Sequence, residues 1–143
     1  MDNLLIFGVG LIGGSIAIEC QKKQMFNHIV GVQREGGTSL SPFVSDGMID
    51  RVSDNLDDDI KQADFIVIAT PVAQIRNILT TISPSLSPKT IVIDVGSTKS
   101  NVMRFAKEEL KEKFPQFVGS HPIAGSEQHG PAAAKINLFK NKD

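Results

Sequence analysis

Three glycines near the N-terminus have the spacing of a phosphate-binding turn. Gly8, Gly10 and Gly13 form the pattern G-x-G-x-x-G directly after a short apolar run. In such a turn the first glycine permits the tight bend, the second lets the backbone approach a pyrophosphate, and the third lets the next helix pack closely against the strand. Free N–H groups at the start of that helix, here around Leu11 and Ile12, bind the anion. The motif therefore predicts a dinucleotide site.

Polar residues also follow three later apolar runs. Thr70 and Pro71 follow one, Ser97 lies in D-V-G-S-T-K after the next, and His121 lies in S-H-P-I-A-G-S-E after the last. Ligands of open α/β sheets bind beyond the carboxyl ends of the strands, so we expect these turns to face the glycine loop. A neutral imidazole there could accept a proton from a substrate. Each residue also has an ordinary interpretation, since Ser97 could cap a helix and Pro71 could begin one.

Strand-like and helix-like segments alternate along the chain. The expected strands are 4–9, 28–33, 64–70, 90–96 and 116–120, and the expected helices are about 11–24, 41–46, 56–62, 72–82 and 98–113. Near-continuous apolar strands are typical of a parallel sheet that is covered on both faces. The alternation therefore predicts an α/β fold of the Rossmann type, with a doubly wound, mostly parallel sheet.

The end of the second expected strand bears on which dinucleotide is bound. An acid usually stands there in NAD sites and accepts hydrogen bonds from the ribose 2′-OH. This chain has Gln33, which does not repel a 2′-phosphate, and then Arg34, whose guanidinium could bind that phosphate and stack on adenine. We expect both residues to contact the cofactor. We therefore expect NADP to be favoured over NAD. Two alternatives remain, because Glu35 becomes the ribose acid if the register shifts by two residues, and Arg34 could be an ordinary surface arginine.

Composition limits the class of protein. The chain has 143 residues, a net charge of -1 and a single cysteine, Cys20. We expect one domain over residues 1–143, with no attraction to nucleic acid or to an anionic membrane. An unpaired cysteine, and the absence of a recognisable signal peptide or membrane span, favour the cytoplasm. The acidic run 57–59 is interpreted as a helix start rather than a metal site, and no metal is expected.

The motifs together resemble a known family. G-V-G-L-I-G-G-S, A-T-P-V, D-V-G-S-T-K and S-H-P-I-A-G-S-E-Q-H-G-P are similar to segments of the prephenate/arogenate dehydrogenases of tyrosine biosynthesis, and the resemblance covers essentially the whole chain. The H-P-I-A-G-[ST]-E segment is the most specific part, because generic Rossmann domains lack it. The resemblance implies an NAD(P)-dependent oxidative decarboxylation, in which prephenate gives 4-hydroxyphenylpyruvate or arogenate gives tyrosine.

The resemblance also implies roles for particular residues. His121 would accept the proton of the ring hydroxyl as hydride leaves, and Ser97 would bond the same hydroxyl or hold the imidazole. Ser126 and Glu127 would contact the substrate, while Thr70 would line the nicotinamide together with its neighbouring proline. These assignments follow from matching motifs, residue by residue.

One feature of the family has no counterpart in this chain. Family members carry a C-terminal, largely helical domain that forms homodimers and supplies an arginine for the substrate carboxylate, whereas this chain ends at Asp143. We therefore expect a dinucleotide-binding domain truncated at its C-terminal end, with that helical domain absent and little turnover alone. The alternatives are a dehydrogenase for another small hydroxy acid and a non-catalytic nucleotide-binding domain.

Overall fold

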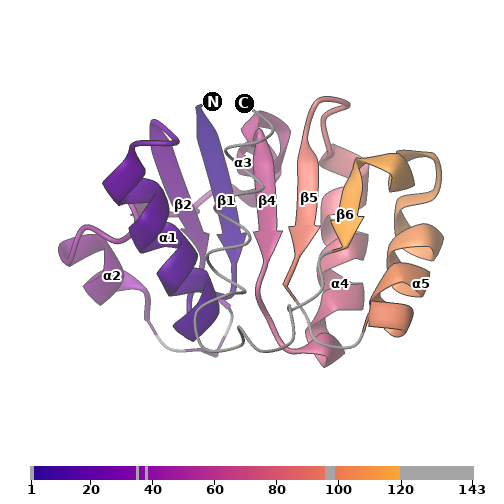
Figure 1. Cartoon of the computed structure of the whole chain (residues 1–143), viewed down its shortest axis with the longest axis horizontal. Coiled ribbons are helices and arrows are strands. Elements are labelled where there is room, and N and C mark those ends of the chain that lie inside the picture. The colour runs from indigo at the N-terminus through magenta and orange to yellow at the C-terminus, as the bar shows by residue number, and fades with distance from the viewer. Residues whose placement is uncertain (1, 35, 38, 96–98, 120–143) are drawn as a thin grey trace.

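The computed structural model describes residues 2–34, 36–37, 39–95 and 99–119, with the backbone alone for residues 11, 99 and 100. The expected positions Glu35, Ser97, His121, Ser126 and Glu127 lie outside the described residues. What is described is an α/β fold whose strands form one sheet (Figure 1).

The sheet contains six described strands in the order β3-β2-β1-β4-β5-β6, and every neighbouring pair is parallel. The strands are β1 (Asn3–Phe7), β2 (His28–Val32), β3 (Arg51–Val52), β4 (Phe65–Ile68), β5 (Ile91–Asp94) and β6 (Phe117–Gly119). The described helices are α1 (Leu11–Lys23), α2 (Ser41–Ser45), α3 (Leu56–Gln62), α4 (Val72–Ile82) and α5 (Lys99–Leu110), with 3-10 turns η1 (Ser83–Ser85) and η2 (Lys111–Gln116). The doubly wound Rossmann-type fold predicted from the sequence is confirmed.

Alternating side chains of β1 supply both faces of the sheet. Leu4 and Ile6 belong to an apolar cluster that includes buried residues of α1. Leu5 and Phe7 belong to a second cluster, built with α3, α4 and α5 on the opposite face. The central strands are therefore buried on both sides, which explains why their sequences are almost wholly apolar. None of the helices described is long and apolar enough to cross a membrane.

The strands β1, β4 and β5 each end two residues earlier than predicted, and two other elements differ more from the expectation. Strand β3 was not predicted, because Arg51–Val52 is too short to leave a hydrophobic period; it pairs with Val30 and Gly31 at the sheet edge. The helix expected over 98–113 ends at Leu110, because Lys111 has a φ of 54° in the left-handed region and the chain continues as the 3-10 turn η2. Neither difference moves the carboxyl edge of the sheet.

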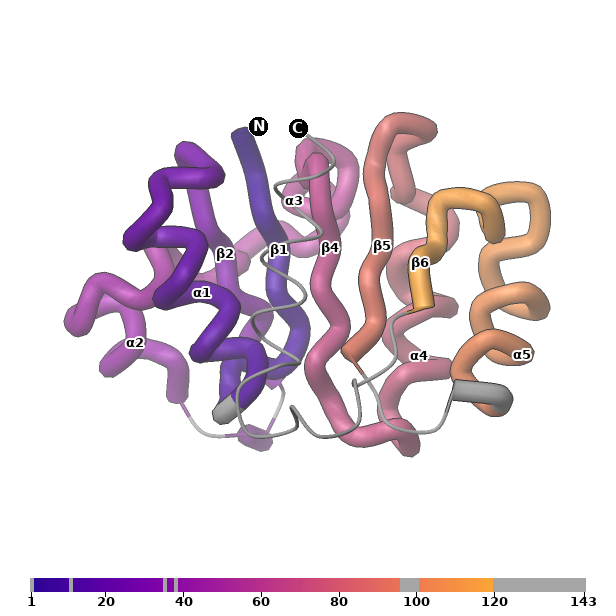
Figure 2. The backbone as a smooth tube through the Cα atoms, in the orientation of Figure 1, coloured from indigo at the N-terminus to yellow at the C-terminus, as the bar shows by residue number. Residues whose placement is uncertain are grey.

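The register of β1 with its neighbours sets the position of that edge. Phe7 pairs with Val32 of β2 on one side and with Ile68 of β4 on the other. The chain therefore leaves β1, β2 and β4 at the same level of the sheet, which is the lower edge in Figure 2. The segments that follow begin at Gly8, Gln33 and Ala69. The fold thus brings the glycine loop beside the turns after β2 and β4.

Candidate functional site

A pocket of about 610 Å³ lies at this carboxyl edge. Its walls come from the turns after β1, β2 and β4 and from the helices α2 and α4. The lining residues are Phe7, Gly8, Val9, Gly10, Val32, Arg34, Gly37, Leu40, Phe43, Ala69, Thr70, Pro71, Gln74 and Ile78. Size, location and a mainly apolar lining with a few polar groups are typical of a small-molecule site.

Gly8 and Gly13 are required by the packing of the protein itself. Gly8 has a φ of 90°, and a Cβ there would lie 2.7 Å from the carbonyl oxygen of Ala69. A Cβ on Gly13 would overlap the carbonyl oxygen of Gly8 and lie 3.3 Å from Ile6. The first glycine therefore makes the turn and admits the end of β4, and the third brings α1 close to β1, as its place in the motif predicts.

Gly10 has a different environment. A Cβ on Gly10 would meet no described atom within 4 Å. Its amide donates to the carbonyl oxygen of Gly8 over 2.9 Å and so closes the turn. Packing among the described residues therefore does not demand a glycine at this position. The open space beside Gly10 belongs to the pocket.

The start of α1 is suited to an anion. Its N-cap is Gly10, which has no side chain to cap the helix, and its first turn contains no acidic residue. The amides of the first turn, from Leu11 through Gly13, have no acceptor within the helix. The positive end of the helix dipole is therefore left for a ligand next to the pocket. Ile12 is exposed at this end, while the pocket wall itself is formed by Gly8, Val9 and Gly10.

The turn after β2 is organised by the side chain of Gln33. Its Oε1 accepts a hydrogen bond from the Leu40 amide over 2.8 Å, and its Nε2 donates to the Arg34 carbonyl oxygen over 3.2 Å. Gln33 thus closes the loop between β2 and α2 and is not among the residues that line the pocket. Arg34 is exposed and does line the pocket. Among the described lining residues it is the one with a basic side chain.

The turn after β4 brings a threonine and a proline to the pocket. The Ala69 amide donates to the Phe7 carbonyl oxygen over 2.8 Å and extends the ladder beyond β4. Thr70 and Pro71 follow in the pocket wall, and Pro71 is the N-cap of α4. The Thr70 hydroxyl oxygen is buried and has no hydrogen-bond partner among the described residues.

Four lining residues carry no signal in the sequence. Leu40 and Phe43 come from the start of α2, and Gln74 and Ile78 come from α4. Nothing in their sequence context indicates a binding role. They line the pocket only because α2 and α4 flank the same edge of the sheet. The buried Asp94 ends β5 one strand further along.

Charged groups elsewhere in the described chain have structural roles. Asp59, in the acidic run at the start of α3, bonds Arg51 over 2.6 Å and Ser53 over 2.5 Å, and Asn55 caps the same helix. Burial disfavours ionisation of Asp59, but the hydrogen bonds from Arg51 and Ser53 outweigh it and lower its pKa. Within the described ranges, no three potential metal ligands cluster.

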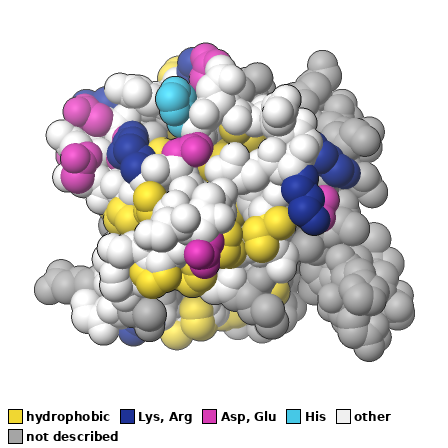
Figure 3. Space-filling model, turned by 90° about the vertical axis from the view of Figure 1, so that its left-hand side faces the viewer, with side chains coloured by type: hydrophobic (Ala, Val, Ile, Leu, Met, Phe, Trp, Pro, Cys, Tyr) yellow, Lys and Arg dark blue, Asp and Glu magenta, His cyan; other side chains and the backbone are white. Residues whose placement is uncertain are grey.

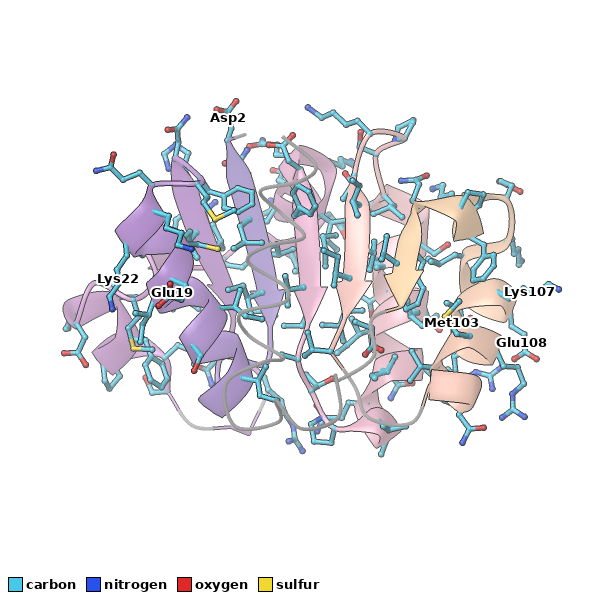
Figure 4. The ribbon with its side chains drawn as sticks, in the orientation of Figure 1. Asp2, Glu19, Lys22, Met103, Lys107 and Glu108 are labelled. Atoms are coloured by element: carbon cyan, nitrogen blue, oxygen red, sulfur yellow. The ribbon has the colours of Figure 1, made fainter. Side chains whose placement is uncertain are left out.

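The surfaces of the described helices carry mixed charge. Figure 3 shows acidic and basic side chains interspersed on the side that lies on the left in Figure 1. In Figure 4 the labelled side chains of α1 (Glu19 and Lys22) and α5 (Lys107 and Glu108) project outward from their helices. None of these four residues lines the pocket, which is formed by the turns at the carboxyl edge and by α2 and α4.

Comparisons with known proteins agree with the fold and the motifs. Residues 16–143 match the family described as prephenate dehydrogenase, nucleotide-binding domain. Prephenate dehydrogenase of Bacillus subtilis is 38% identical over 141 residues, which are 98% of this chain and 38% of that protein. The chain thus spans about two fifths of the length of that relative.

Solved structures give the same result. The crystal structure of prephenate dehydrogenase from Aquifex aeolicus, in complex with hydroxyphenyl propionate and NAD+, has a TM-score of 0.74 and 33% identity, over 87% of this chain and 43% of that one. Arogenate dehydrogenase from Synechocystis has a TM-score of 0.69 and 29% identity, over 86% and 41%. Because the family match covers most of its length, this chain belongs to the prephenate dehydrogenase family and contains its nucleotide-binding domain.

Proposed function

We propose that residues 1–143 form the dinucleotide-binding domain of an enzyme that oxidatively decarboxylates prephenate or arogenate. The observation that carries the proposal is the contrast among the three glycines. Gly8 and Gly13 are fixed by contacts within the protein, whereas Gly10 lines the pocket and a Cβ on it would meet no described atom within 4 Å. A pyrophosphate that approaches the backbone at Gly10 explains why that position has no side chain.

The order of strands gives the direction in which a dinucleotide would lie. Arg34 follows β2, the glycine loop follows β1, and Thr70 follows β4, so they occupy successive positions along the sheet edge. With the pyrophosphate at Gly10, one half of the ligand extends toward Arg34 and the other toward Thr70. We assign the adenosine half to the Arg34 side, because the ribose contact of this fold follows β2.

NADP is the preferred cofactor in this proposal. No acid directly follows β2, and Gln33 is already bonded to the Leu40 amide, so the usual acceptor for a ribose 2′-OH is missing at this position. Arg34 lines the pocket and offers a guanidinium to a 2′-phosphate. Glu35 remains the alternative ribose ligand; a NAD preference would assign it that role.

The chemistry rests on residues matched to the family motifs. The bound cofactor would accept a hydride from the substrate carbon that bears the hydroxyl. His121 would take the hydroxyl proton and return it to the ring oxygen when the carboxylate leaves as CO2 and the ring becomes aromatic. Ser97 would hold the hydroxyl or the imidazole, and Ser126 and Glu127 would contact the rest of the substrate.

A titration tests the binding half of the proposal. The chain contains no Trp or Tyr, so the fluorescence of a reduced nicotinamide cofactor can be followed with little protein background. NADPH should bind saturably, and NADH more weakly. If neither cofactor bound, the proposed dinucleotide site would be refuted.

A turnover assay tests the catalytic half. We expect the 143-residue chain alone to be poorly active, and activity to appear when it is joined to the C-terminal region of the longer Bacillus subtilis relative. In that protein His121→Asn should lower kcat by about 100-fold or more, the usual contribution of a positioned acid–base group. Cofactor affinity should stay unchanged. An unchanged kcat would remove His121 from the mechanism.

A further inference from the structure

The described helices cover the two faces of the sheet unequally. Helices α3, α4 and α5 pack against one apolar cluster, whereas α1 and α2 pack against the cluster on the opposite face. In Figure 1 α1 lies over β1 and β2, and α2 lies beyond it, away from β5 and β6. On this face, therefore, no helix of the described part of the chain lies over β5 and β6, although parallel sheets are normally covered on both sides.

This part of the face is nevertheless apolar and buried. Ile93 of β5 stands in register between Val67 of β4 and Val118 of β6. Ile93 and Val67 are 0% exposed, and Val118 is half-buried. Neighbouring strands flank a side chain but do not cover its outer end, because side chains stand out from the sheet toward a packed layer about 10 Å away. A further apolar element must therefore cover Ile93.

The chain that follows β6 has the length and the pattern to supply this cover. Residues 120–143 lie beyond β6, outside the described part of the chain, and include Ala132, Ile136 and Phe139. These three follow the i, i+4, i+7 spacing of one helical face, and Pro131 precedes them, at a position where proline often begins a helix. A helix from Pro131 to Phe139 would be about 14 Å long, enough to cross three neighbouring strands.

We propose that residues 131–139 form a helix whose apolar face packs over Ile93 and its neighbours in β4 and β6. This packing holds residues 120–130 at both ends, with β6 on one side and the helix on the other. The segment held in this way carries His121. Its importance for catalysis rests on the proposed function, whereas the packing itself does not.

A single tryptophan tests the packing, because the chain contains no Trp or Tyr of its own. Phe139→Trp should emit at shorter wavelength than an indole in water and should resist quenching by iodide. Asn137→Trp is the matched control, since position 137 lies on the opposite side of the same helix and its indole should be fully quenched. Emission from both variants like that of an exposed indole would overturn the inference.

Nuclear Overhauser contacts in the unmodified protein give a second measurement, which does not depend on how the variants fold. The methyl groups of Ile93 should show contacts to Ile136 or Phe139. Those of Val92, which belongs to the cluster with α4 and α5, should show none. Absence of the Ile93 contacts would overturn the inference, and so would contacts that disappear on dilution, because a second copy of the chain would then be the cover. A wild type that binds no NADPH would refute the proposed function alone.

Discussion

Replacing Gly10 should abolish dinucleotide binding while the fold survives. A Cβ at this position meets no described atom within 4 Å. Gly10→Ala and Gly10→Val should therefore change the free energy of unfolding by no more than about 1 kcal/mol, as for other substitutions away from tight packing. The added carbons would stand in the part of the pocket that the pyrophosphate needs.

The loss of affinity can be estimated from the hydrogen bonds that become unavailable. A pyrophosphate held away from the first turn of α1 forfeits bonds to backbone amides, each worth roughly 1.5–3 kcal/mol when the acceptor is charged. Losing two such bonds costs about 3 kcal/mol or more, which corresponds to at least a 100-fold rise in Kd. The valine variant, with the larger side chain, should bind no more tightly than the alanine variant.

Isothermal titration with NADPH, paired with thermal denaturation, measures both quantities. Gly13→Ala is the informative contrast, because its Cβ would overlap the Gly8 carbonyl oxygen and should therefore destabilise the fold along with binding. A Gly10→Val protein that melts like wild type and binds NADPH with wild-type affinity would refute the reasoning. It would show that the ligand does not occupy the space beside Gly10.

Three further outcomes are expected. Arg34→Ala should weaken NADPH about tenfold or more and leave NADH nearly unchanged, because only NADPH carries the 2′-phosphate; equal losses in a titration of both would exclude that role. Burial disfavours the charged form of Asp64, but hydrogen bonds from the Asn3 and Asp2 amides outweigh it and lower its pKa. Asp64→Asn should therefore destabilise the protein at pH 7, and chemical denaturation should show the difference from wild type shrinking as the pH falls below about 4; a difference independent of pH would contradict this. Burial and the nearby Glu19 raise the pKa of the Cys20 thiol to about 12, so a thiol reagent should modify Cys20 only after denaturation, and rapid labelling of the native protein would contradict its burial.

Much of the fold could be predicted because its signals are local. The apolar runs of β1, β4 and β5 are buried on both faces, and their sequences show it directly. The edge strand β3 gave no such signal, since Arg51 and Val52 are half-buried or exposed and pair with β2 along a single side. The end of α5 could not be predicted, because it depends on the left-handed conformation of Lys111. Lysine is not a residue type that indicates such a conformation.

The site was predictable in its turns but not in its walls. The glycine spacing located Gly8, Gly10 and Gly13 because each has a distinct steric role, and the structure shows a packing reason for the first and third. Phe43 and Ile78 could not be found, since their place in the pocket arises only when α2 and α4 meet at one edge. The sequence pattern likewise does not indicate that the Gln33 side chain, after β2, accepts a hydrogen bond from the Leu40 amide at the other end of the loop.

That side chain belongs to Gln33, which the sequence suggested as a direct cofactor contact. Its amide group instead bonds the Leu40 amide and the Arg34 carbonyl oxygen, so it holds the loop that carries Arg34. The contact itself remains a prediction, and the geometry assigns Gln33 a positioning role for the neighbouring arginine.

The central claim is that the pocket at the carboxyl edge binds a nicotinamide dinucleotide across the glycine loop. Amide chemical shifts of the 15.5 kDa chain, recorded by NMR during a titration with NADP+, test this residue by residue. The account predicts saturable shifts that are largest for the amides of Gly10, Arg34 and Thr70, with Lys107 on the outer face of α5 unmoved. Saturable shifts that spare these three amides, or no shifts at all, would contradict it.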